Sequence, residues 1–209
     1  MINSNKMSIS NCRLCSFKGI ELAFELEGMP QWNHRLLQTH EVSTDRSIHL
    51  QVYRCPSCGF VSVPMKLSED YYDDYLNVPS LSALAQHFQA EQALDFVNRF
   101  DLVGRKILEV GCGDGFFLQA MQDAGAHCFG IEPSSGQRQV ACARGLVVEE
   151  GILSEQRLLK DAPFDAFVTR QVFEHVEDML DFLKSIRSNL QKGAVGLVEV
   201  PNLDKLAEE

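Results

Sequence analysis

The sequence lacks the long apolar runs that membrane-spanning and secreted proteins carry. No stretch comes near the roughly 18 consecutive apolar residues that a transmembrane helix needs, and the mean hydropathy is −0.11. Residues 1–10 are polar and contain no apolar signal-peptide segment. We therefore expect a cytoplasmic protein that makes no membrane contact.

Basic residues are scarce: 19 Lys and Arg stand against 29 Asp and Glu, which gives a net charge of −10. Nucleic acids and anionic membranes bind basic faces, so this charge disfavours both as partners. Hydrophobic residues make up 45% of the sequence, which is more than a disordered chain contains. No internal repeat or low-complexity tract stands out.

The length of 209 residues exceeds one domain of roughly 150 residues, which suggests one main domain and a small accessory one. We expect a small β-rich module over 1–65 and a linker with an amphipathic helix over 66–103. The main α/β domain should cover 104–209.

Four of the seven cysteines form two Cys-x-x-Cys pairs, Cys12 with Cys15 and Cys55 with Cys58. Two such turns can close a tetrahedral shell of four thiolates around Zn²⁺. The intervening residues 16–54 exceed the roughly 15–20 of the common zinc pattern, so they should carry one or two hairpins. The alternatives are two unrelated cysteine pairs, a redox Cys-x-x-Cys, or a site of three cysteines and one histidine (His34, His40 or His49).

The other three cysteines, Cys112, Cys128 and Cys142, lie in apolar surroundings and are interpreted as small core residues. An odd cysteine count in a chain with no signal peptide argues against a disulfide framework.

Strands and helices alternate after residue 104, which predicts a parallel sheet with helical crossovers. The expected strands are 106–110, 127–131, 146–148, 164–169 and 194–200. The expected helices are 80–100, capped by Ser80 or Ser82, and then 116–124, 134–144 and 176–190. Ahead of them, 48–54 and 60–64 have the character of short strands flanking the second cysteine pair.

A glycine loop follows the first strand of the main domain, with Gly111, Gly113 and Gly115 opening directly into a helix. Such a loop lets a ligand approach the backbone and meet the N–H groups of a helix N-terminus. Phe116 stands where a dinucleotide fingerprint has its third glycine, and no Gly-Lys-Ser/Thr of a Walker loop follows.

Glu132 ends the second strand, about 20 residues after the loop, where a carboxylate is placed to accept both hydroxyls of a ribose. The loop and this acid together predict a site for a nucleoside-bearing cofactor. Gln171 and His175 follow the fourth strand and should lie in the same crevice, because the carboxyl ends of parallel strands line it.

The segment from Glu109 to Gly115 resembles the first motif of class I S-adenosylmethionine-dependent methyltransferases, E/D-x-G-x-G-x-G. The resemblance implies a Rossmann-like parallel sheet and S-adenosylmethionine as the cofactor. It implies that Glu109, the three glycines, Glu132 and Gln171 bind that cofactor. It also implies catalytic roles for the Glu174–His175 pair, with His175 either a general base or a residue that braces the loop.

The order of the four-cysteine module, a tyrosine-rich stretch and this fold resembles the deoxysugar C-methyltransferases. That resemblance implies carbon methylation of a nucleotide-linked sugar, with Tyr71, Tyr72 or Tyr75 in either a substrate or a packing role. The alternatives are a zinc- and cofactor-binding chain without independent activity, and an RNA methyltransferase with a zinc ribbon.

The resembling fold continues beyond a fifth strand, whereas this chain stops at Glu209. We therefore expect a sheet truncated after the fifth strand, whose open edge self-associates or pairs with a partner chain.

Overall fold

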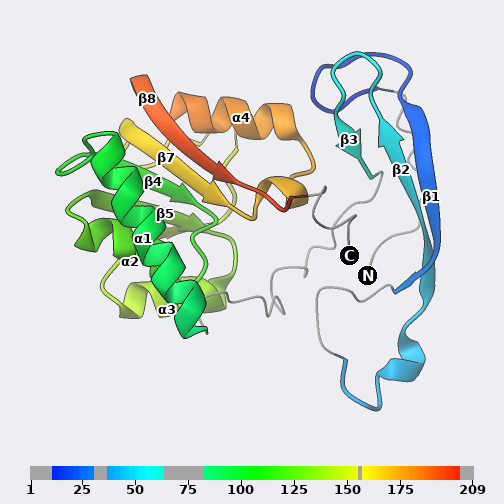
Figure 1. Ribbon diagram of the computed structural model, residues 1–209, viewed down its shortest axis with the longest axis horizontal. Helices are drawn as coiled ribbons and strands as arrows, with labels where there is room; N and C mark the ends of the chain where they lie inside the picture. Colours follow the sequence, from blue (N-terminus) through cyan, green and yellow to red (C-terminus); the bar gives the residue numbers. More distant parts are fainter. Residues whose placement is uncertain (1–10, 31–36, 64–81, 155–156, 203–209) are drawn as a thin grey trace. The chain divides into compact units, whose positions relative to one another are not determined.

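The computed structural model describes residues 11–30, 37–63, 82–154 and 157–202, which form two compact units (Figure 1). One unit comprises residues 1–77 together with 177–180, and the other comprises 78–176 and 181–209. The linker expected over 66–79, with Tyr71, Tyr72 and Tyr75, lies outside the described residues. No helix in the described ranges has the length and apolar character needed to cross a membrane.

The N-terminal unit contains a three-stranded antiparallel sheet in the order β1-β2-β3. The strands are β1 (Glu21–Pro30), β2 (Ser47–Arg54) and β3 (Val61–Ser62), and a short 3-10 helix, η1 (Val42–Thr44), precedes β2. The expected strands before and after the second cysteine pair are present. Strand β1 was not among the predicted strands, although Leu22, Phe24 and Leu26 recur at every second position in it. Nearly all of its residues are exposed, and its pairing with β2 is irregular.

The second unit is a five-stranded parallel sheet in the order β6-β5-β4-β7-β8. Its strands are β4 (Lys106–Val110), β5 (His127–Glu132), β6 (Val147–Glu150), β7 (Phe164–Arg170) and β8 (Leu190–Glu199). This confirms the expected Rossmann-like arrangement. Strand β8 begins earlier than predicted, with an irregular register opposite the start of β7.

Helix α1 (Ala83–Arg99) precedes β4, and α2 (Phe116–Asp123), α3 (Ser135–Ala143) and α4 (Met179–Ser188) follow β4, β5 and β7 along the chain. The 3-10 helix η3 (Phe173–His175) lies between β7 and α4. Ser82 caps α1, because its Oγ accepts a hydrogen bond from the N–H of Ala85 at 3.4 Å. Ser134 caps α3 in the same way through the N–H of Gln137. Both caps follow the expected local pattern.

The main core lies between the sheet and helices α1 and α2, with Phe96, Ile107, Leu118 and Val168 among its buried members. Residues that alternate with these along the strands, such as Leu108 and Ile131, are also buried. The sheet is therefore covered on both faces, as parallel sheets usually are. Cys112 and Cys128 are buried as expected, but Cys142 is exposed on α3, which corrects the prediction of a core role.

Strand β8 forms one edge of this sheet, since β7 is its only pairing partner within the described residues. Val198 and Val200 at its carboxyl end are about half exposed, at 46% and 49%. The predicted self-association through this edge stays a prediction.

Candidate functional site

The carboxyl ends of β4, β5 and β7 bring the predicted cofactor residues together. The glycine loop directly follows β4, and all three of its glycines have positive φ, from 55° to 77°. A side chain at Gly111 would lie 2.5 Å from Val172, and one at Gly115 would lie 2.5 Å from Leu146. These two glycines are therefore required by close packing.

Gly113 differs from its neighbours in the loop, because a Cβ placed there would meet no atom within 4 Å. Its φ of 55° still disfavours other residues. The space beside Gly113 lets a ligand approach the backbone, since no atom of the described residues lies within 4 Å of a Cβ placed there.

Glu132 links the glycine loop to the end of β5. One carboxylate oxygen accepts the N–H of Gly113 and the other accepts the N–H of Ser134, each at 2.8 Å. Burial raises the pKa of Glu132, and these two backbone hydrogen bonds oppose the rise. A carboxylate can accept about four hydrogen bonds, so Glu132 retains acceptor capacity for a ribose. The predicted ribose contact itself stays a prediction.

Glu109 lies at the end of β4 and is 3% exposed. Its Oε2 atom has no hydrogen-bond partner within the described part of the chain. Burial raises the pKa of Glu109 to about 8, although the nearby charge of Arg170 opposes the rise. A buried carboxyl oxygen without a hydrogen-bond partner lowers the stability of the fold. Such an oxygen at a strand end is typical of a functional site, where a ligand can supply the missing hydrogen bond.

His175 and Glu174 lie in η3, directly after β7. Burial lowers the pKa of His175, while the charge of Glu174, whose Oε1 is 4.0 Å from Nε2, raises it. The net effect keeps the imidazole neutral at neutral pH. A neutral imidazole can accept a proton, as a general base must.

A polar network at the ends of β7 and β8 was missed in the sequence. Arg170 contacts Glu199 through two nitrogens, with NH2 to Oε1 at 3.1 Å and Nε to Oε2 at 3.3 Å. Gln89 and Gln92 of α1 also join it. The available signal was a charged residue at the end of each strand, Arg170 in β7 and Glu199 in β8, with charges of opposite sign.

Gln171 belongs to the same network. It has a positive φ of 53°, which is unusual for a residue other than glycine. Its N–H donates to the carbonyl oxygen of Glu199 at 2.8 Å, and its Nε2 donates to Oε1 of Glu199 at 3.4 Å. Strained backbone of this kind collects at functional sites.

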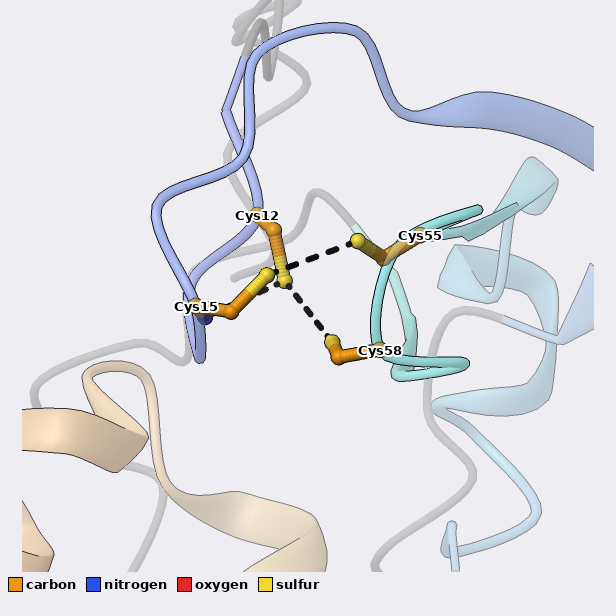
Figure 2. A group of neighbouring side chains, drawn as sticks. All are labelled: Cys12, Cys15, Cys55 and Cys58. Atoms are coloured by element: carbon orange, nitrogen blue, oxygen red, sulfur yellow. Dashed lines mark hydrogen bonds between the residues drawn. The ribbon is translucent and has the colours of Figure 1, made fainter.

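The four cysteines of the N-terminal unit form a second, separate cluster (Figure 2). Their Sγ atoms all lie within 4.8 Å of one another, with Cys12 3.7 Å from Cys58 and Cys15 3.6 Å from Cys55. Zn–S bonds of about 2.3 Å in a tetrahedron place sulfur atoms roughly 3.8 Å apart. Neither His40 nor His49 takes part in the cluster, and His34 lies outside the described residues.

Two backbone turns of the same kind present these thiols. In the first, the N–H of Cys12 donates to the carbonyl oxygen of Phe17, and the N–H of Ser16 donates to the carbonyl oxygen of Cys12. In the second, the N–H of Cys55 donates to the carbonyl oxygen of Phe60, and the N–H of Gly59 donates to the carbonyl oxygen of Cys55. The fifth residue of each turn has positive φ. The sequence pattern drew attention only to Gly59, and the shared repeat, Cys-x-x-Cys-Ser/Gly-Phe, became evident from the paired turns.

The thiols are too close to ionise independently. Burial raises the pKa of Cys55, but N–H groups of Cys58 and Ser57 lower it to about 7. A backbone hydrogen bond from Phe60 lowers the pKa of Cys58, yet burial and the neighbouring thiols raise it to about 12. Several thiolates can share this space when a cation offsets their charges.

Comparison with known proteins decides the family. The family described as "Methyltransferase domain" matches residues 85–209, which is more than half of the chain. The chain belongs to this family. The match begins within α1, so that helix is part of the methyltransferase domain.

Curated relatives of the methyltransferase domain are named for ubiquinone biosynthesis. Over 104 residues, 33% are identical to the ubiquinone biosynthesis O-methyltransferase of Actinobacillus pleuropneumoniae serotype 7, which is 45% of this chain and 44% of that protein. For the enzyme of Xylella fastidiosa strain 9a5c, identity is 36% over 94 residues, or 41% and 37% of the two chains. The matches thus span less than two thirds of these relatives.

A solved structure shares the fold. The plantazolicin methyltransferase BpumL, in complex with a triazolic desmethylPZN analog and SAH, superposes with a TM-score of 0.53 at 18% identity. The superposition covers 62% of this chain and 52% of that one. The expected class I methyltransferase fold is therefore confirmed. None of these three relatives is named as a deoxysugar C-methyltransferase.

Proposed function

We propose that the methyltransferase domain binds S-adenosylmethionine and transfers its methyl group to a small molecule. The observation that carries the proposal is the loop geometry. Gly113 borders open space while its N–H is tied to Glu132 at the adjoining strand end. The relatives named as O-methyltransferases and the SAH-bound structural neighbour support the same cofactor.

The residues present fit this cofactor. Glu132 would hold the ribose hydroxyls, and the loop from Gly111 to Gly115 would face the methionyl part. Glu109 and Gln171 would bind the polar end of the methionyl part, and Oε2 of Glu109, which has no partner among the described residues, would accept a hydrogen bond from it. When bound, the cofactor supplies an electrophilic methyl group on a sulfonium, and transfer then depends mainly on in-line positioning of the acceptor.

His175 would accept the proton that the acceptor loses. It is neutral near pH 7 because burial lowers its pKa. The Glu174 carboxylate nearby would stabilise the imidazolium that forms when the ring nitrogen takes this proton. The acceptor's oxygen or carbon would form a bond to the methyl carbon as the sulfur–methyl bond of the sulfonium breaks and its electron pair returns to sulfur. The acceptor's bond to hydrogen would break as the imidazole of His175 takes the proton, so charge and atoms balance.

For the acceptor we propose a small molecule with a hydroxyl group, since the curated relatives are named for O-methylation. Carbon methylation of a nucleotide-linked sugar is the second candidate, and the order of the four-cysteine module and methyltransferase domain favours it. Both acceptors must lose a proton, so both use His175 in the same role.

We propose further that Cys12, Cys15, Cys55 and Cys58 hold one Zn²⁺ in a structural site. Sulfur separations of 3.6 and 3.7 Å support this, because they match the edge of a tetrahedral zinc–thiolate centre. Four thiolates leave no open coordination position, so this metal would stabilise the N-terminal unit and take no part in catalysis.

The experiment is calorimetric titration with S-adenosylmethionine, SAH and NAD, followed by methyl transfer to a catechol, a nucleotide-linked ketosugar and RNA. Binding of SAH with transfer to the catechol is the expected result. Transfer only to the sugar or to RNA would overturn the proposed acceptor, and binding of NAD without SAH would overturn the cofactor. Binding without any transfer would favour a chain that lacks independent activity.

Replacing His175 tests its proposed role as the general base. His175→Gln should lower kcat on the order of a hundredfold or more while SAH affinity stays the same. His127→Gln is the matched control, since His127 is exposed at the amino end of β5. An equal loss in both variants would contradict a base role for His175.

A further inference from the structure

The Arg170–Glu199 pair lies next to the proposed cofactor site, yet Arg170 has little capacity left for a ligand. Its Nε and NH2 atoms donate to Glu199, and its NH1 donates to Oε1 of Gln89 at 3.1 Å. Its guanidinium also stacks 4.2 Å from the ring centre of Phe117. All three nitrogen atoms and one face of the group are thus engaged within the protein.

Glu199 is the centre of the network. Besides Arg170, its carboxylate accepts hydrogen bonds from Nε2 of Gln92 at 3.0 Å and Nε2 of Gln171 at 3.4 Å. Burial raises the pKa of Glu199, but these donors and the charge of Arg170 outweigh burial and lower it. Glu199 is therefore ionised at neutral pH and holds three segments together: α1, the end of β7 and the end of β8.

These contacts determine two features of the site. The first is the strained backbone of Gln171, which is held by the carbonyl and carboxylate oxygens of Glu199. The second is the position of α1, whose Gln89 and Gln92 reach across to the ends of β7 and β8. The backbone of Gln171 depends on these directed hydrogen bonds. Helix α1 is held both by the bonds of Gln89 and Gln92 and by apolar side chains such as Phe96 that are buried in the core.

We infer that Arg170 and Glu199 are a positioning pair for methyl transfer, holding Gln171 and α1 at the site without binding a ligand themselves. This inference rests on the proposed function. It assigns a role to side chains that neither the glycine loop nor the Glu174–His175 pair accounts for.

Stability and positioning can be separated by a double replacement. Arg170 and Glu199 are partly buried, with side chains 14% and 25% exposed. Losing one partner of such an ion pair leaves a partly desolvated unpaired charge, whereas replacing both by apolar residues of similar size often restores stability. Arg170→Met and Glu199→Leu should each lower the melting temperature, and the double variant should recover it. The double variant should still bind SAH at least roughly tenfold more weakly and turn over on the order of a hundredfold more slowly.

A double variant with both stability and SAH affinity restored would overturn the inference, because the pair would then be a structural ion pair only. The control is Asp95→Asn with Arg99→Gln, which removes an exposed ion pair of 2.8 Å on the same helix. It should change neither SAH affinity nor turnover. SAH binding by the parent protein is measured first, so its absence would count against the proposed function alone.

Two further measurements apply even where the double variant is unstable. Amide hydrogen exchange along α1 should quicken in the conservative variant Glu199→Gln and stay unchanged in the Asp95–Arg99 control. This readout needs no cofactor, so it tests the attachment of α1 independently of the proposed function. Unchanged exchange in Glu199→Gln would contradict the inferred attachment.

The second measurement is the pH profile of SAH binding, because Glu199 and Arg170 act on Glu109 with opposite sign. Glu199→Gln should move the Glu109 midpoint to lower pH, and Arg170→Met should move it to higher pH. Shifts in the same direction would contradict the geometry. The charged or titratable groups that face Glu109 are Arg170, Glu132, Asp114, Glu199, Cys112 and Cys128.

Discussion

The two units of this chain reach order by different means. In the described ranges 11–30 and 37–63, the buried apolar residues are Cys12, Val52 and Cys55, and two of these belong to the cysteine cluster. The α/β unit instead buries a continuous core around Ile107, Leu118 and other apolar side chains. A small sheet with so little core needs a cross-link such as a metal ion, whereas the parallel sheet is stabilised by its own burial.

Removing the proposed zinc ion should have the largest effect, and it should destabilise the N-terminal unit without destabilising the α/β unit. Structural zinc sites contribute apparent free energies of roughly 10–16 kcal/mol, so chelation or Cys55→Ala should unfold the N-terminal unit. The α/β unit should keep its helical circular dichroism and its SAH affinity. Metal analysis should find about one zinc per chain in the parent. Cys142→Ala, which alters an exposed cysteine outside the cluster, should retain it, and a fully zinc-loaded Cys55→Ala would contradict the site.

A cavity in the α/β core should destabilise the α/β unit and leave the N-terminal unit unaffected. Leu118 is fully buried, so Leu118→Ala should lower the free energy of unfolding of this unit by roughly 2–5 kcal/mol. Zinc content should stay the same. Leu158→Ala, at a side chain 68% exposed, serves as the control and should be nearly neutral. Loss of zinc in Leu118→Ala would show that the two units do not fold independently.

The buried carboxyl of Glu109 distinguishes the two units further, because it makes the free energy of unfolding of the α/β unit depend on pH. Its pKa is about 8 in the folded protein against 4.5 for the free side chain. Stability from this group is complete below pH 4.5 and falls as pH rises towards 8. Glu109→Gln should therefore match the parent at pH 4 and exceed its stability at pH 8 by on the order of a few kcal/mol.

Denaturant unfolding at both pH values, without cofactor, measures this difference. The control is Glu91→Gln on the exposed side of α1, which should follow the parent at each pH. A stability difference independent of pH would show that Glu109 does not titrate in this range.

The smallest expected effect concerns Glu132. Glu132→Ala removes the proposed ribose acceptor and the two backbone contacts of Gly113 and Ser134. Hydrogen bonds to a charged group contribute roughly 1.5–3 kcal/mol, so SAH affinity measured by calorimetry should fall about tenfold or more. Glu150→Ala, a half-exposed residue at the end of β6, is the control. Unchanged affinity in Glu132→Ala would contradict the cofactor assignment of this residue.

The sequence by itself determined the features that depend on short-range geometry. Strict spacing placed Gly111, Gly113 and Gly115 in a turn that requires positive φ, and it placed Cys55 and Cys58 in a turn that lets two thiols converge. Apolar periodicity located every strand of the parallel sheet, since a buried strand between helices needs a nearly continuous apolar run. Strand β1 carries a signal of the same kind, because Leu22, Phe24 and Leu26 recur at every second position, although the structure leaves these side chains exposed.

Only the tertiary structure decided the features that join distant segments. Arg170 and Glu199 meet because β7 and β8 are neighbours in register, and Gln89 and Gln92 reach them from a helix far earlier in the chain. That Oε2 of Glu109 has no hydrogen-bond partner among the described residues likewise depends on what packs around it. Directed hydrogen bonds and burial are properties of three-dimensional surroundings, so spacing along the chain carries no record of them.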